Sequence, residues 1–100
     1  MKEFKGTHGE WNYNHARGEV VSKSEGLIAE LVVNGREDNN GSLIAAAPDL
    51  LEALRMLEVS VNNIRYCWEK RPENMWKAIQ QAENDCESAR AAISKALGED

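Results

Sequence analysis

Apolar side chains recur in steps of three and four residues through the second half of this sequence. The first series is Leu50, Leu54, Leu57, Val61, Ile64 and Trp68, and the second is Met75, Ile79, Ala82, Cys86, Ala89, Ile93 and Ala96. Such spacing places each series on one face of an α-helix. The segment "EKRPEN", residues 69–74, separates them. The pattern predicts two long antiparallel helices, one with a bulky seam and one with a smaller seam, packed against each other.

A proline marks the start of the first long helix, within "NNGSLIAAAPDLLEALRMLE", residues 39–58. Pro48 lacks a backbone N–H, which a helix does not need in its first turn. Asp49 and Glu52 suit the positive N-terminal end that follows. We predict a helical hairpin over residues 42–98, in which "GSLIAAA" forms a short helical turn before Pro48. The polar segment 34–41 is predicted as a loop, with Asn39 or Asn40 as the helix cap.

Three short runs in the N-terminal third are typical of strands. They are "EWNYN", "EVVSK" and "LIAELVV", the last at residues 27–33, and short turn segments separate them. This arrangement predicts an antiparallel β-meander over residues 10–33, preceded by a frayed tail at residues 1–9. The expected fold class is therefore α+β, with a small N-terminal antiparallel β-meander followed by two long antiparallel α-helices. A length of 100 residues fits a single domain, 1–100.

Composition argues against several functional classes. The chain is 42% hydrophobic and 29% charged, which is ordinary for a folded soluble protein. A net charge of −5 argues against binding long DNA or RNA, although a few local arginines would suffice for a small anion. No apolar run is long enough to cross a membrane, and the N-terminus lacks the pattern of a signal peptide. A cytoplasmic protein is expected.

Catalytic and metal-binding patterns are scarce. The sequence contains no GxSxG, P-loop, GxGxxG or HExxH motif. Cys67 and Cys86 lack the spacing of a metal site. On the predicted hairpin they lie on the order of 13 Å apart, and a disulfide needs Cα atoms within roughly 7 Å, so both are expected as free thiols. We therefore expect no enzyme, no cofactor and no metal.

Aromatic and basic residues form the candidate ligand-binding set. Trp11 and Tyr13 share one face of the first predicted strand, where they either cap the core or stack on a base. Arg17 follows in the next turn. Arg65 and Arg71 lie near the turn of the hairpin, where a solvated helix end is the simpler interpretation, although the arginine fork also suits phosphate. The candidate ligand-binding residues are thus Trp11, Tyr13, Arg17, Arg65 and Arg71.

The predicted helices are longer than the sheet can cover. They run to about 22 and 26 residues, which is more than about 30 Å each. A three-stranded sheet covers only part of that length. We therefore expect a homo-oligomer in which another copy covers the remainder.

The segment around Pro48 resembles one that is common in small phage-encoded proteins. The residues that carry this resemblance are Asn40, Leu43 to Ala47, Pro48, Asp49, Leu50, Leu51, Ala53 and Leu54. The layout of residues 10–97 also resembles that of phage Thoeris anti-defence sponges, which have a small antiparallel sheet followed by two long helices.

The resemblance to the sponges implies a function. It implies a dimer-based ring, such as a hexamer, in the host bacterial cytosol. That ring would bind cyclic nucleotide signals, namely cyclic ADP-ribose isomers and cyclic oligonucleotides of the CBASS type, and would sequester them without cleavage. The alternative hypothesis is an oligomeric protein–protein interaction module that inhibits a host protein through its helical face.

Overall fold

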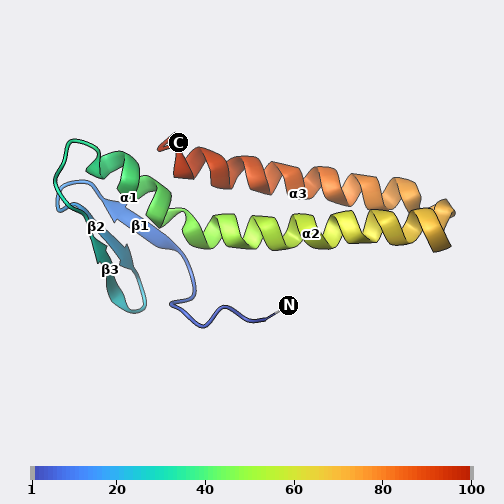
Figure 1. Ribbon diagram of the computed structural model, residues 1–100, viewed down its shortest axis with the longest axis horizontal. Coiled ribbons are helices and arrows are strands. Elements are labelled where there is room, and N and C mark those ends of the chain that lie inside the picture. The colour runs from blue at the N-terminus through green and yellow to red at the C-terminus, as the bar shows by residue number, and fades with distance from the viewer. Residues whose placement is uncertain (1, 100) are drawn as a thin grey trace.

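The computed structural model describes residues 2–99 and confirms the α+β class. Strands β1 (Trp11–Asn14), β2 (Glu19–Ser22) and β3 (Gly26–Glu30) come first. Helices α1 (Glu37–Ala45), α2 (Ala47–Lys70) and α3 (Met75–Ala96) follow, with the 3₁₀ turn η1 (Pro72–Asn74) between the last two. The molecule measures 53 × 27 × 19 Å, and the sheet lies at the open end of the α2–α3 hairpin, far from η1 (Figure 1).

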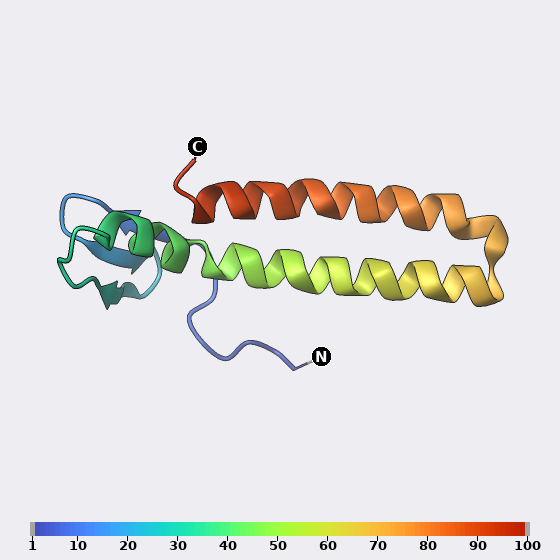
Figure 2. The same cartoon turned by 45° about the horizontal axis from the view of Figure 1, so that its top comes forward.

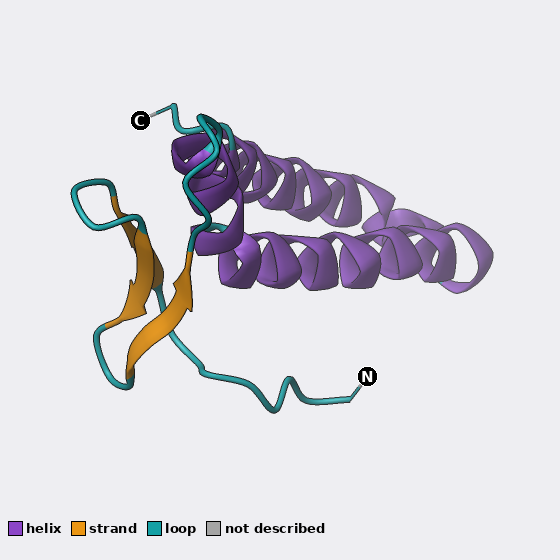
Figure 3. Ribbon diagram, turned by 60° about the vertical axis from the view of Figure 1, so that its left-hand side comes forward, coloured by secondary structure: helices purple, strands orange, loops and turns teal. Residues whose placement is uncertain are grey.

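The sheet is an antiparallel meander in the order β1-β2-β3 (Figure 3). Tyr13 pairs with Val20, and Val20 pairs with Ala29 on the other side. Val20 is 0% exposed, so the central strand anchors the sheet. Gly18 and Gly26 adopt positive φ angles of 64° and 84°, which the two tight turns need and which glycine allows without strain. The predicted meander is thus observed.

The third strand is shorter than predicted. We expected it to span residues 27–33, but β3 ends at Glu30, which pairs with Glu19 at the start of β2. No residue of β2 remains to pair with the chain beyond Glu30. Val32 and Val33 consequently leave the sheet and are 77% and 85% exposed.

Helix α1 corrects the prediction of a loop at residues 34–41. It begins at Glu37, so Asn39 and Asn40 lie inside the helix and do not cap it. The turn before it is held by Asn34, whose side chain accepts from the N–H of Arg36 at 2.9 Å and whose own N–H donates to Glu37 at 3.2 Å. Sequence spacing missed α1 because its two buried residues are the small Gly41 and Ala45.

The proline is placed as predicted. Pro48 lies in the first turn of α2, and Asp49 is the acidic residue of that turn. Ala46 separates α2 from α1, so the two helices follow one another with a break at this residue (Figure 2). The predicted short helical turn before the proline is therefore the end of a nine-residue helix.

The interface between α2 and α3 differs from the predicted seam. Its buried residues are small and seven apart: Ala53, Ser60 and Cys67 on α2, and Ala78, Asp85 and Ala92 on α3. Leu54, Val61 and Trp68 were predicted in this seam but are 65%, 61% and 73% exposed. Small side chains lie between the helices because they let the two axes approach closely. The bulky series is therefore turned away from the α2–α3 contact.

Candidate functional site

The five candidate residues lie at two ends of the molecule. Trp11, Tyr13 and Arg17 belong to β1 and the turn after it, whereas Arg65 and Arg71 lie near η1 at the far end of the hairpin (Figure 1). One protomer therefore does not bring the two groups together. Acidic side chains accompany all three arginines, with nitrogen–oxygen distances of 4.0 Å (Arg17–Glu19), 3.4 Å (Arg65–Glu69) and 3.9 Å (Arg71–Glu73).

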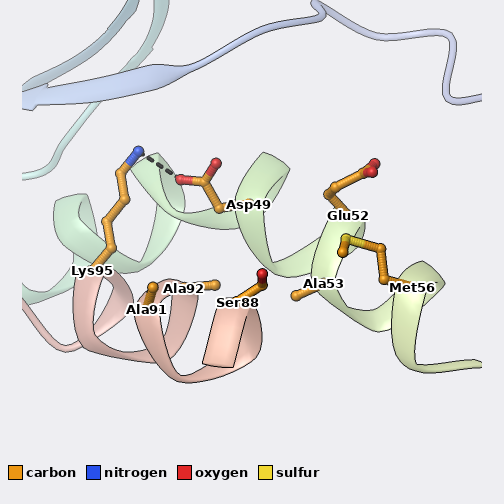
Figure 4. Close-up of a pocket in the computed structure, with 8 residues that line it drawn as sticks. All are labelled: Asp49, Glu52, Ala53, Met56, Ser88, Ala91, Ala92 and Lys95. Atoms are coloured by element: carbon orange, nitrogen blue, oxygen red, sulfur yellow. Dashed lines mark hydrogen bonds and ion pairs between the residues drawn. The ribbon is translucent and has the colours of Figure 1, made fainter. Parts of the chain in front are cut away.

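Lys95 connects the sheet to both helices of the hairpin. Its ammonium group donates to Asp49 at 2.8 Å (Figure 4). It also donates to the carbonyl of Trp11 at 3.0 Å and lies 3.7 Å from Glu10. The Lys95 side chain is only 25% exposed, so solvent screens these contacts less than at an open surface. The indole N–H of Trp11 donates to the carbonyl of Thr7 at 3.1 Å, which gives this aromatic residue a structural role.

Tyr13 belongs to a polar cluster with α1. Its hydroxyl donates to Asp38 at 2.7 Å, and His15 Nδ1 lies 2.9 Å from the other oxygen of that carboxylate. The hydrogen bond to Asp38 is the main cause that raises the pKa of Tyr13 to about 12. The same bond, followed by the one from His15, lowers the pKa of Asp38 below its ordinary value. The ring of Tyr13 packs directly on Gly41, where a Cβ atom would meet it.

This cluster predicts a pH dependence with a defined sign. Because the folded pKa of Tyr13 is raised, its contribution to stability is present below 10.0 and is lost as pH rises through about 12. The lowered pKa of Asp38 has the opposite pH dependence. Its contribution to stability is present above the ordinary pKa of an aspartate and is lost as pH falls through the lowered pKa. Absorbance titration in a Tyr66→Phe background, where Tyr13 is the remaining tyrosine, should give a midpoint near 12.

Asp38→Asn in that background provides the control, because it removes the charged acceptor. Its tyrosine midpoint should move down toward 10.0, the ordinary value. An unchanged midpoint in the Asp38→Asn protein would contradict the assigned hydrogen bond.

A cleft of about 580 Å³ opens where β1, α1 and the C-terminal end of α3 meet, and we name it the junction cleft. Its volume is within the range of small-ligand sites. Tyr13 lines it together with the polar residues Asn12, Ser42 and Ser94. The charged residues on its wall are Lys95, Glu10 and Glu99. Two carboxylates beside one engaged ammonium do not favour a phosphate group at this place.

A second cleft, of about 420 Å³, runs along the hairpin beside Asp49, Glu52 and Lys95 (Figure 4). Its wall between α2 and α3 also includes Met56, Ser88 and the three alanines Ala53, Ala91 and Ala92. Its charged residues are again two acids and the same lysine. Both clefts therefore share Lys95, whose role the sequence did not reveal because its partners lie 46 and 84 residues away along the chain.

An apolar surface lies at the sheet end, formed by Leu31, Val32, Leu43 and Ile44, and we name it the β3–α1 patch. Val32 is 77% exposed and Leu43 is 54% exposed. The polar residues Glu30, Asn34 and Asn40 lie around this patch, which has a hollow of about 440 Å³. Sequence reasoning missed the patch because it assigned residues 31–33 to a strand and residues 34–41 to a loop.

Residues 2–99 contain no group of three or more His, Cys, Asp or Glu side chains that could hold a metal ion. Within the same range, no helix is both long and apolar enough to cross a membrane. Cys67 is buried, Cys86 is half-buried, and both are free thiols.

The fold and its surfaces define a small α+β protein in which a three-stranded meander and a short helix close the open end of a long helical hairpin. The chain belongs to the phage family described as Salmonella phage P22 protein Y8K6, whose profile matches residues 1–100. This match confirms the prediction of a small phage protein. No curated protein and no solved structure matches the chain.

Proposed function

We propose that this phage protein acts by binding a host protein, as an oligomeric interaction module without catalytic activity. The observation that carries the proposal is the β3–α1 patch, where Val32 and Leu43 expose most of their apolar surface beside Leu31 and Ile44. Contiguous apolar surface with a polar rim is typical of protein–protein interaction sites. Glu30, Asn34 and Asn40 supply such a rim.

The position of β3 supports the same proposal. Strand order β1-β2-β3 leaves β3 at the edge of the sheet, next to the patch. An open strand edge offers backbone hydrogen bonds to an extended segment of a partner. Apolar side chains of that segment would fill the hollow between Val32 and Leu43. The expected partner therefore presents an extended segment with apolar side chains.

A second candidate function is the sequestration of a cyclic nucleotide, as the resemblance to sponges implies. The junction cleft supports this candidate by its size of about 580 Å³ and by the position of Tyr13 on its wall. Glu10 and Glu99 oppose an anion there. A dianionic ligand would consequently need Arg65 or Arg71 from another subunit, because these residues lie at the other end of the protomer.

One purification experiment compares the two candidates. Tagged protein is expressed in host cells and recovered as the wild type, as Val32→Asp/Leu43→Asp, and as the control Val59→Asp. Val59 is 62% exposed on the hairpin and lies outside the patch, so it matches the exposure of the substituted residues. We expect one host protein in stoichiometric amount with the wild type and the control, and at least tenfold less with the double variant.

The same eluates are denatured and their small molecules are analysed by mass spectrometry. An intact cyclic nucleotide released equally by all three proteins, with no host protein, would contradict the interaction module and support the sponge. Circular dichroism of the three proteins checks that each remains folded. Equal recovery of the host protein by the double variant would show that the patch is not the binding site.

A further inference from the structure

The bulky residues that the α2–α3 contact leaves outside share one side of the hairpin. Leu54, Val61 and Trp68 each follow a buried residue of α2 by one position, and Ile79, Cys86 and Ile93 each follow a buried residue of α3 by one. Because the two helices run antiparallel, residues that follow the buried positions by one place lie on the same side of the helix pair in both helices. We call each such side a flank of the hairpin. All six residues are apolar, and together with Leu57, Ile64, Met75, Ala82 and Ala89 they form what we name the apolar hairpin face.

The opposite flank has a different composition. The residues one position before the buried ones are Glu52, Val59, Tyr66, Lys77, Asn84 and Ala91. The sheet attaches on this polar side, because Lys95 holds the Trp11 carbonyl there and shares a cleft with Glu52 and Ala91. The sheet thus attaches on the polar side at the open end of the hairpin (Figure 1), and the apolar hairpin face remains exposed to solvent, with Trp68 73% and Ile93 50% exposed.

We infer that a second copy of this chain covers the apolar hairpin face and forms a four-helix bundle. The face is long enough for a stable pair. The 24 residues of α2 span about 36 Å, and two packed helices are roughly 20 Å wide, so each copy offers on the order of 700 Å². A standard interface takes about 800 Å² from each partner.

Side-chain sizes favour one arrangement of the two copies. The hydrogen bond between Ser60 and Asp85 sets the two residues at the same height, so Leu57 lies near the height of Ala89 and Ile64 near that of Ala82. A twofold axis parallel to the helices places α2 of one copy over α3 of the other at equal height. At the heights of Leu57 and Ile64, a large side chain of one copy then meets a small one of the other, which is how helical bundles fill their cores.

Charges at the edge of the face support the same arrangement. Glu58 and Arg65 lie beyond the apolar residues of α2, and Glu83 and Arg90 lie beyond those of α3. With the parallel axis, Glu58 comes within one helical turn of Arg90 of the second copy, and Arg65 comes equally close to Glu83. Exposed ion pairs contribute little affinity, but opposite charges in register select the orientation.

The test uses two valines of equal exposure on opposite flanks. Val61 is 61% exposed on the apolar hairpin face, and Val59 is 62% exposed on the polar flank. Sedimentation of the wild type and of Val59→Glu should give at least twice the 11.2 kDa mass of the chain. Val61→Glu should raise the dimer dissociation constant at least 100-fold. A monomeric wild type at 100 µM (roughly the upper limit for a functional pair), or a dimer insensitive to Val61→Glu, would overturn the inference.

Two further measurements keep the inference testable without relying on one variant. Alkylation of Cys86 in the wild type should slow at least tenfold above the dissociation constant, because the second copy covers this thiol. A rate independent of protein concentration would overturn the inference. Glu58→Arg should weaken the dimer, and adding Arg90→Glu should restore it; failure of this restoration would refute the parallel axis.

The inference goes beyond the proposed function, because the hairpin face and the β3–α1 patch are separate surfaces. Loss of host-protein capture by Val32→Asp/Leu43→Asp with an intact dimer tests the proposed function alone. Loss of the dimer in Val61→Glu tests the present inference alone.

Discussion

Ala92→Asp should destabilise the protein by about 3–5 kcal/mol, because it places an unpaired charge between α2 and α3. Ala92 is 4% exposed and faces the equally buried Ala53 in the narrow contact between the helices. Small domains have only about 5–15 kcal/mol of stability in total. We therefore expect the urea midpoint of this variant to fall by a fifth or more.

The adjacent residue provides a matched control. Ala91 is exposed on the polar flank, so Ala91→Asp adds the same charge in contact with water. Its effect should stay within about 0.5 kcal/mol, as is usual for surface substitutions. Equal loss of stability in the two variants would mean that the buried face of α3 is assigned wrongly.

Gly41→Ala should destabilise the protein by about 1–3 kcal/mol, against the usual direction of this substitution. Alanine in place of a helical glycine normally adds about 1 kcal/mol of stability. In α1, however, the new Cβ would overlap the ring of Tyr13, whose hydroxyl is fixed by Asp38. The ring would have to move and lose that hydrogen bond.

A double-mutant cycle with Tyr13→Ala tests this explanation. Without the tyrosine ring, Gly41→Ala meets no obstacle and should regain its ordinary stabilising sign. Thermal or urea unfolding of the four proteins gives the coupling between the two positions. The same destabilisation in both backgrounds would show that the ring of Tyr13 is not the cause.

The long helices were predictable because their signal is local. Apolar spacing of three and four residues defined α2 and α3, and the missing N–H of Pro48 defined where α2 starts. Which residues lie between the helices was not predictable in the same way. The spacing of apolar residues locates the centre of the bulky stripe on each helix. The residues in contact between α2 and α3 are instead small ones such as Ala53 and Ser60, which precede the bulky residues by one position.

The candidate site depended on contacts that local patterns do not carry. Lys95 meets Trp11 across 84 residues, and Tyr13 meets Asp38 across 25. The sequence pattern did not predict helix α1, because the residue through which α1 packs on Tyr13 is Gly41, and glycine usually indicates a turn. The arginines were predicted as a group suited to anions, but their separation along the hairpin follows from tertiary structure alone.

The buried Ser60–Asp85 pair has a consequence for how the hairpin aligns. Buried small residues recur every seven positions on both helices, so a slip of one heptad would leave the packing of their side chains almost unchanged. Such a slip would place Asp85 opposite Ala53 or Cys67, where no hydroxyl meets the carboxylate that Ser60 and Gln81 now satisfy. The aspartate thereby discriminates among sterically equivalent alignments, as one buried polar residue does in a coiled coil.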